Sequence, residues 1–303
     1  NALAVVTYNA AGGRAEDARR VTNPAPPPPA DLIAVSVGIN DYSGHRKAVG
    51  GARGLGDLSF ALKDARGIAD AFRAFRGDGG CFADARIDLR LDADATRGKL
   101  LGALKTAGAK ARPDDLLVVF FAGHGDLLGG ADPKLVAAND RARGARAGAG
   151  RFVLCGPDYA RDAADRTGLS AEELFDALAG VNCRKVVLLD ACHAGEAAAA
   201  NVVRRFVPDG HGPFVVASCD QGQLSYEDPR LGHGVFTAAL LDALGPGYRR
   251  ADADSDGALS GDELYEYVTA QVPLLLRRAG KAADTQRPIC FPRQPSREAV
   301  VSR

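Results

Sequence analysis

Residues 186–195 have the sequence Val-Val-Leu-Leu-Asp-Ala-Cys-His-Ala-Gly, an apolar run that ends in a cysteine followed by small residues. A second run, at residues 116–125, has the sequence Leu-Leu-Val-Val-Phe-Phe-Ala-Gly-His-Gly. Each apolar part is short and rich in β-branched or aromatic residues, which predicts a buried strand. Because the carboxyl ends of parallel strands meet at one edge of a sheet, we expect Cys192 and His124 to lie close together there.

Strand-like and helix-like segments alternate from residue 31 onward, which predicts an α/β fold with a mostly parallel sheet. Strands are expected at residues 32–39, 87–91, 116–120, 152–155, 186–189, 214–218 and 289–291. Helices are expected at residues 58–75, 96–107, 235–244 and 263–276, and from Ser170 onward, where Ser170 and Glu173 have the spacing of a capping box. The expected architecture is one sandwich of about six core strands with exposed loops at 129–150 and 196–213.

A proline-rich segment separates the α/β region from the amino-terminal residues. Residues 24–29 have the sequence Pro-Ala-Pro-Pro-Pro-Pro, which predicts a stiff extended linker. The apolar residues 2–8 before it are either the last strand of an upstream β domain or a disordered arm. We expect an upstream region with its linker at 1–30, the α/β domain at 31–295 and a tail at 296–303. Since the chain contains no methionine, we also expect Asn1 to lie within a longer polypeptide.

The composition is that of an ordinary globular protein, with 303 residues, 46% hydrophobic and 25% charged. The 38 basic and 38 acidic residues give a formal net charge of zero, which argues against a nucleic-acid partner. No apolar run approaches the roughly 18 residues of a membrane span, so no membrane partner is expected. Six cysteines are too sparse for a secreted disulfide framework, so we expect thiols and a cytoplasmic location.

The residues around Cys192 favour a reactive thiol over a structural one. A lone cysteine usually behaves as a small buried hydrophobe. Cys192, however, follows a strand and precedes Ala194 and Gly195, where a thiol is presented rather than packed. A histidine on a neighbouring strand end can act as the base that generates a thiolate, and His124 has that position. His233, in a second Gly-His-Gly, has no predicted strand before it and is expected to be structural.

As a set, these motifs resemble the caspase family, and they are closer to its metacaspase and bacterial caspase-like branches than to animal caspases. Further family-like runs lie at residues 37–42, 62–65 and 232–237. The resemblance covers about residues 31–291 and implies a caspase-like α/β/α sandwich. It also implies a cysteine endopeptidase in which His124 activates Cys192 and the thiolate forms an acyl-enzyme that water hydrolyses. The backbone N–H groups of Gly125 and Cys192 would form the oxyanion hole.

The resemblance also implies a substrate preference. Animal caspases carry a glutamine two residues before the catalytic cysteine and a Ser-aromatic-Arg run, which help to form a basic pocket for aspartate. Here Asp190 has the first position and Ser225-Tyr226-Glu227 stands for the second run. We therefore expect an acidic pocket and peptide substrates with Arg or Lys before the scissile bond. Asp64 is either a further member of this pocket or a residue that complements a helix start.

Self-processing in exposed loops is implied as well. The candidate cleavage residues are Arg204 and Arg205 in the loop after the Cys192 strand, and Arg141, Arg143, Arg146 and Arg151 in or beside the earlier loop. The alternative is that these arginines are ordinary solvated loop residues.

An acidic segment near the carboxyl end matches the pattern of a calcium-binding loop. The oxygen ligands of positions 1, 3, 5 and 12 would be Asp252, Asp254, Asp256 and Glu263, with glycine at position 6. Calcium is therefore an expected cofactor, although the peptidase chemistry does not require one. The alternative is an acidic turn that ends in a capping box between Ser260 and Glu263.

Two other functions fit the sequence. One is a non-enzymatic caspase-fold interaction module, against which the presence of both Cys192 and His124 argues. The other is a Cys-His hydrolase of another substrate class, such as an esterase or amidase, against which the acidic pocket argues. An upstream domain or a regulatory partner is also expected.

Overall fold

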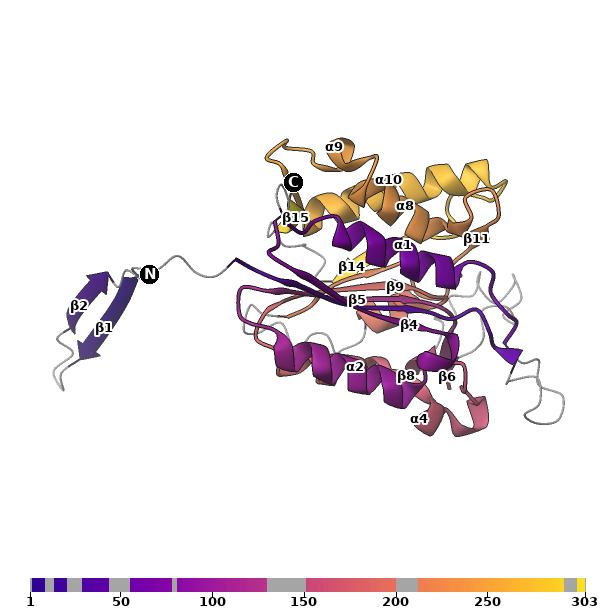
Figure 1. Ribbon diagram of the computed structural model, residues 1–303, viewed down its shortest axis with the longest axis horizontal. Helices are drawn as coiled ribbons and strands as arrows, with labels where there is room; N and C mark the ends of the chain where they lie inside the picture. Colours follow the sequence, from indigo (N-terminus) through magenta and orange to yellow (C-terminus); the bar gives the residue numbers. More distant parts are fainter. Residues whose placement is uncertain are drawn as a thin grey trace.

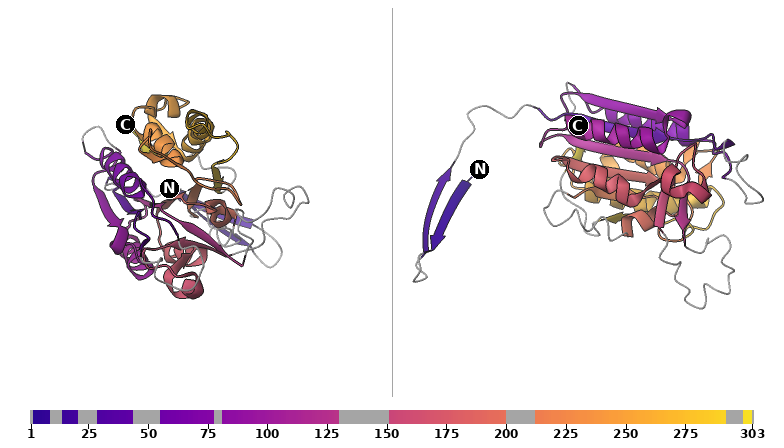
Figure 2. Two further views of the ribbon diagram at one scale, coloured as in Figure 1. Left: turned by 90° about the vertical axis from the view of Figure 1, so that its right-hand side faces the viewer. Right: turned by 90° about the horizontal axis from the view of Figure 1, so that it is seen from below.

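The computed structural model describes residues 2–8, 14–20, 29–43, 55–77, 81–129, 151–199, 212–291 and 299–302. Their main feature is a six-stranded sheet that lies between two layers of helices, as Figures 1 and 2 show. This arrangement confirms the α/β/α sandwich and the mostly parallel sheet that the alternating sequence pattern predicts.

The central sheet is parallel except at one edge. In spatial order its strands are β14 (Ile289–Phe291), β10 (Phe214–Ala217), β9 (Arg184–Asp190), β5 (Leu116–Ala122), β3 (Leu32–Gly38) and β4 (Ala85–Leu91). Only β14 pairs antiparallel with its neighbour among these strands. Every residue of β3 and β5 is buried, because helices cover both faces of the sheet. The edge strand β4 carries the charged residues Arg86, Asp88 and Arg90, which discourage pairing with another chain.

Two helical layers create two apolar cores. One face of the sheet packs against α1 (Ala61–Arg73), α8 (Val235–Leu244) and α10 (Gly261–Arg278), which lie above the sheet in Figure 1. The other face packs against α2 (Arg97–Lys110) and α5 (Ala171–Ala179). Alternate residues of β5 contribute to opposite cores, as a strand between two layers requires. The shorter helices are η2 (Asp92–Asp94), η3 (Arg161–Ala163), α4 (Ala164–Thr167), α6 (Ala194–Ala199) and α9 (Tyr248–Ala251).

Small antiparallel sheets complete the described fold. They are β6 (Gly125–Leu128) with β7 (Arg151–Cys155) and β8 (Gly168–Ser170), β11 (Glu227–Asp228) with β12 (His233–Gly234), β13 (Ala258–Ser260) with β15 (Ala299–Ser302), and β1 (Ala2–Tyr8) with β2 (Arg14–Arg20). The strand expected at 152–155 is therefore present, but it pairs with β6 and β8 outside the central sheet. β15 attaches residues 299–302 to β13, in the segment expected to be a tail.

Several helix boundaries follow from local sequence. The capping box at the start of α5 is confirmed, since the Ser170 side chain accepts from the Glu173 N–H and Glu173 accepts from the Ser170 N–H. Residues 196–199, expected to begin a loop, instead belong to the alanine-rich α6, and residues 200–211 of the expected loop lie outside the described residues. Most of the loop expected at 129–150 lies outside the described residues. None of the described helices combines the length and the apolar character needed to cross a lipid bilayer.

Candidate active site

His124 and Cys192 follow the ends of two neighbouring strands. β5 and β9 are parallel, and their register pairs Ala122 with Asp190, so each side chain comes two residues after the last paired position. The Gly123 N–H donates to the Asp190 carbonyl over 3.1 Å and continues the ladder beyond the strands. His124 and Cys192 both line a cavity of about 190 Å³ at this edge of the sheet.

His124 is held by contacts on its backbone and its ring. Its N–H donates to the Tyr42 hydroxyl over 2.9 Å, and that hydroxyl donates to the Cys155 carbonyl over 3.2 Å. The Tyr42 ring meets the imidazole edge-on with 4.6 Å between centroids. His124 Nε2 lies 2.8 Å from the Gly56 carbonyl oxygen. Because a carbonyl oxygen can only accept, this contact assigns the proton to Nε2 and makes Nδ1 the basic nitrogen.

Cys192 lies in a tight turn between β9 and α6. The next residue, His193, has a φ of +62°, a left-handed conformation that non-glycine residues rarely adopt. The His193 N–H donates to the Gln223 carbonyl over 3.1 Å. The Cys192 Sγ lies 3.9 Å from the Ser225 carbonyl oxygen. Gly195 allows the start of α6 to pack closely against the segment after β10, since a β-carbon there would come within 2.7 Å of the Cys219 carbonyl.

Four of the other five cysteines are buried, and only Cys81 shares the partial exposure of Cys192. All six cysteines are described, and none forms a disulfide. Cys192 is partly exposed, whereas Cys155 and Cys219 are buried. Burial raises the pKa of Cys219 to about 12 and the pKa of Cys155 well above its usual value, so both remain protonated at neutral pH. Of the six cysteines, Cys192 is the one that lines the cavity.

Asp190 and Asp64 supply two buried carboxylates to the cavity wall. Asp190 accepts from the Ser225 hydroxyl over 2.6 Å and from the Thr237 hydroxyl over 2.5 Å. Gly234 lies against both carboxylates, because a β-carbon there would come within 2.6 Å of Asp190 Oδ2 and 3.2 Å of Asp64 Oδ2. Burial, together with repulsion from Asp64, raises the pKa of Asp190 to about 7. Asp190 is therefore only partly ionised near neutral pH.

His233, which the sequence predicts to be structural, is a hydrogen-bond partner of Asp64. The short strand β12 places its Nδ1 2.6 Å from Asp64 Oδ1, and the Gly234 N–H donates to Asp64 Oδ2 over 3.0 Å. Burial raises the pKa of Asp64, while these two hydrogen bonds act in the opposite direction. β12 was not predicted from the sequence, because it contains only two residues, His233 and Gly234.

Glu227 lines the same cavity, and both of its carboxylate oxygens also bind backbone. Oε1 accepts from the Phe60 N–H over 2.8 Å, and Oε2 accepts from the Ser59 N–H over 3.0 Å. These donors precede α1, whose N-cap residue has no side-chain cap of its own. Glu227 therefore fixes the start of α1 to the pocket wall and complements the helix dipole.

Comparison with known protein families gives a match that spans all the cavity residues described above. The family model of the caspase domain matches residues 31–297. This chain belongs to the caspase-domain family. Membership indicates a cysteine peptidase in general terms and, with it, protein substrates. A search of curated proteins found no match.

Two crystal structures share the fold of this caspase domain. Protein GSU0716 from Geobacter sulfurreducens is 19% identical with a TM-score of 0.56, and the match covers 90% of this chain and 100% of that one. Caspase-1 from Spodoptera frugiperda is 13% identical with a TM-score of 0.51, and the match covers 89% of this chain and 91% of that one. At these identities the likeness extends to the fold alone.

Three positioning residues of the caspase domain were not singled out from the sequence. Tyr42 holds His124, and Thr237 holds Asp190 through its hydroxyl and its N–H. Gln286 is fully buried and binds the segment that carries Ser225 and Tyr226, since its Nε2 donates to the Ser225 hydroxyl over 3.0 Å and its Oε1 accepts from the Tyr226 N–H over 3.1 Å. Tyr42 and Thr237 lie in family-like runs, whereas Gln286 has no local signal.

The remaining candidate residues lie elsewhere. Arg204, Arg205, Arg141, Arg143 and Arg146 fall outside the described residues. Arg151 begins β7 and forms a salt bridge with Asp165. The acidic loop between α9 and α10 brings Asp252, Asp254 and Asp256 together, but Glu263 is not part of that cluster.

Proposed function

We propose that this caspase domain is a cysteine endopeptidase with Cys192 as nucleophile and His124 as base. The observation that supports this most strongly is that the thiol and the imidazole line one cavity at the carboxyl edge of the sheet. The contact of Nε2 with the Gly56 carbonyl leaves Nδ1 as the proton acceptor of His124. No other cysteine of the chain lines this cavity, and Cys155 and Cys219 are held protonated.

The proposed reaction transfers one acyl group twice. His124 takes the proton of the Cys192 thiol, and the thiolate attacks the carbonyl carbon of the scissile peptide bond. The C–N bond breaks as the imidazolium gives its proton to the leaving amine. Water then attacks the thioester with His124 as base, which releases the acid and restores the thiol. The N–H groups of Gly125 and Cys192 are the proposed oxyanion donors, since these residues lie on adjoining segments.

We propose Arg or Lys as the residue before the scissile bond. Asp190 and Asp64 present two buried carboxylates to the cavity, and Glu227 adds a third at its wall. Ser225 fixes the Asp190 carboxylate through its hydroxyl, and Tyr226 contributes an aromatic side chain to the wall. A substrate guanidinium or ammonium would favour the ionised form of the acidic pair and form charge-assisted hydrogen bonds with it. An aspartate side chain would be repelled by the ionised carboxylates of this pocket.

Self-processing is the second part of the proposal. The favoured targets are the arginines in the segments outside the described residues, Arg204, Arg205, Arg141, Arg143 and Arg146. Arg151 is a poorer target, since it belongs to a paired strand and forms an ion pair with Asp165. Peptidases cleave extended, accessible segments more readily than paired strands.

Fluorogenic peptides that differ only in the residue before the bond test the proposal. We expect kcat/KM for Arg and Lys to exceed that for Asp on the order of 100-fold. The variants Cys192→Ala and His124→Ala should lose this activity. Esters of the same acids test the hydrolase alternative, and fragment mapping of wild type against Cys192→Ala tests self-processing. Absence of any Cys192-dependent peptide cleavage, or a preference for Asp, would reject the proposed function.

A further inference from the structure

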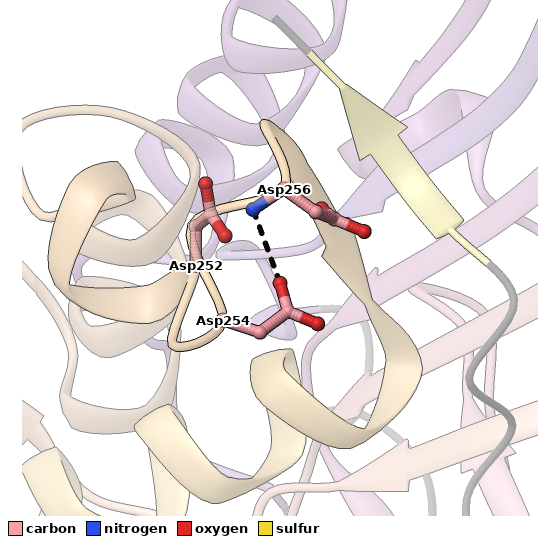
Figure 3. A group of neighbouring side chains, drawn as sticks. All are labelled: Asp252, Asp254 and Asp256. Atoms are coloured by element: carbon pink, nitrogen blue, oxygen red, sulfur yellow. Dashed lines mark hydrogen bonds between the residues drawn. The ribbon is translucent and has the colours of Figure 1, made fainter.

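The segment at residues 252–260, between α9 and α10, holds a cluster of carboxylates away from the catalytic cavity. One ligand oxygen from each of Asp252, Asp254 and Asp256 lies within 4.8 Å of the other two. Figure 3 shows the three side chains around the turn of this loop. No salt bridge in the described ranges joins any of them to a lysine or arginine. We infer that these three aspartates bind a calcium ion.

Asp252 provides an observation that is independent of the acidic cluster. Only 8% of this residue is exposed. Its Oδ2 accepts from the Gly257 N–H over 3.1 Å, but its Oδ1 is buried and has no hydrogen-bond partner among the described residues. A buried carboxylate oxygen without a partner is costly, because it has lost its hydration with nothing in return. A cation beside Asp252 would supply the missing partner.

The backbone of the loop orients all three carboxylates. Asp254 Oδ1 accepts from the Asp256 N–H over 3.1 Å, and Asp256 Oδ1 accepts from the Ala258 N–H over 2.7 Å. With the Asp252 bond to Gly257, each carboxylate uses one oxygen to bind the loop two to five residues further on. Gly257 has a φ of +84°, which allows the sharp turn that this arrangement requires. The loop is therefore shaped around the cluster by its own hydrogen bonds.

Both ends of the loop are anchored in the core, so little ordering is left for a cation to induce. Ala251 and Leu259 are buried, and Leu259 belongs to β13, which pairs with β15. The Tyr248 hydroxyl donates to the Gly257 carbonyl over 3.0 Å. A binding site that is already ordered loses less conformational entropy when the ligand arrives.

Glu263 has a different role from the one expected at position 12. Its Oε2 accepts from the Ser260 N–H and hydroxyl, which forms the capping box of α10, and its Oε1 accepts from the Ala253 N–H over 2.8 Å. Glu263 thus connects the two ends of the loop. It is a positioning residue in this structure, and the three aspartates are the proposed ligands.

The ligand chemistry favours calcium over other common cations. Carboxylate oxygens are hard ligands, which suit Ca²⁺ and Mg²⁺ rather than thiophilic or imidazole-binding metals. Calcium accepts six to eight oxygens in flexible geometry, so that backbone carbonyls and water can complete the shell. Magnesium requires near-ideal octahedral geometry and gives up water reluctantly. An irregular loop that offers three carboxylates therefore fits calcium better than magnesium.

The site does not depend on the proposed peptidase function. The loop follows α9, and the helix before α9 is α8, a ten-residue helix of about 15 Å whose first turn holds Asp190 through Thr237. Binding is therefore expected to stabilise the layer formed by α8, α9 and α10, whether or not Cys192 is reactive.

The test uses the full chain with Cys192→Ala, so that self-cleavage cannot interfere, after removal of metals with a chelator. Calorimetric titration with CaCl₂ should give one site with a dissociation constant of about 10⁻⁶ to 10⁻³ M. Calcium should raise Tm by about 3 to 8 °C relative to chelator, and MgCl₂ at the same concentration should raise it less. Asp254→Asn and Asp256→Asn keep an acceptor for the turn and should each weaken binding about tenfold or more.

Glu266→Gln is the matched control, because Glu266 is exposed on α10 one turn beyond Glu263 and should leave affinity unchanged. Asp252→Asn should lose calcium binding yet retain or raise Tm in chelator, since it removes a buried charge. The inference is overturned if CaCl₂ up to about 10 mM gives neither binding heat nor a Tm shift. Calcium affinity equal to that of the parent Cys192→Ala protein in both Asp254→Asn and Asp256→Asn would also overturn the inference, because the ion would then lie elsewhere.

Discussion

Gly125 lies against the backbone carbonyl of Cys192, so closely that a β-carbon on residue 125 would overlap this oxygen and come within 2.7 Å of the Phe152 ring. The segments that follow β5 and β9 are therefore in direct contact. His124 immediately precedes Gly125, so this contact relates the position of the proposed base to that of the proposed nucleophile. A glycine is required because any side chain would separate the two segments.

Gly125→Ala should reduce kcat/KM at least about 100-fold, because it forces apart the segments that carry the proposed base and thiol. Gly102→Ala is the control, since a β-carbon at that position of α2 meets no atom within 4 Å. That control should retain activity and gain about 1 kcal/mol of stability. Peptidase assays and urea unfolding measure both effects. Full activity in Gly125→Ala would mean that this close contact is not needed.

Tyr42→Phe should lower kcat about tenfold or more with little change in KM. The substitution removes the acceptor of the His124 N–H and the donor to the Cys155 carbonyl, which should also cost about 1 to 3 kcal/mol of stability. Tyr248→Phe removes a comparable hydroxyl bond to the Gly257 carbonyl, remote from the catalytic cavity. That variant should lose stability but keep kcat. An unchanged kcat in Tyr42→Phe would contradict the positioning role.

The preference for arginine should weaken as the pH falls through about 7, the pKa to which burial and Asp64 raise Asp190. Protonation removes the charge that attracts the substrate cation. The ratio of kcat/KM for an Arg peptide to that for its citrulline counterpart isolates this effect, because the thiol and imidazole act on both. Below pH 7 the ratio should fall by up to about tenfold per pH unit, and Asp190→Asn should make it low at every pH. A ratio independent of pH in wild type would reject the acidic pocket.

Asp190 should also make folding stability depend on pH. Its folded pKa of about 7 lies above the unfolded value near 3.8, so the folded chain retains a proton that the unfolded chain releases. The free energy of unfolding should therefore decrease as the pH rises from about 4 to 7, by an amount on the order of 3 kcal/mol. Urea unfolding of Cys192→Ala with and without Asp190→Asn measures this difference. An identical pH dependence in both proteins would count against a buried, protonated Asp190.

The sequence predicted a helix or strand correctly where the residues of that element alone show its characteristic pattern. The continuous apolar runs of β5 and β9 predicted buried parallel strands, and the capping box at Ser170 predicted where α5 begins. Strand length and composition did not show which sheet a strand joins. The strand at 152–155 therefore was not recognised as a partner of β6, since the antiparallel pairing depends on segments far apart in sequence.

The site residues that directly follow the end of a strand could be predicted from the sequence. His124 and Cys192 were found because parallel register carries both to one sheet edge. The contacts of Gln286 and the contact between His233 and Asp64 could not be predicted, because they join residues 60 to 169 positions apart through irregular segments. The double role of Glu227, in the pocket wall and at the start of α1, likewise depends on tertiary contact.

The rate of alkylation at Cys192 tests the proposed dyad most directly. Iodoacetamide labelling followed by mass spectrometry compares Cys192 with Cys81, which is also partly exposed but does not line the cavity. We expect Cys192 to react on the order of tenfold faster near pH 6.5, since a neighbouring histidine increases its thiolate fraction. The variant His124→Ala should reduce the Cys192 rate to that of Cys81. Equal rates for the two thiols in wild type, or a Cys192 rate unaffected by His124→Ala, would contradict the proposed dyad.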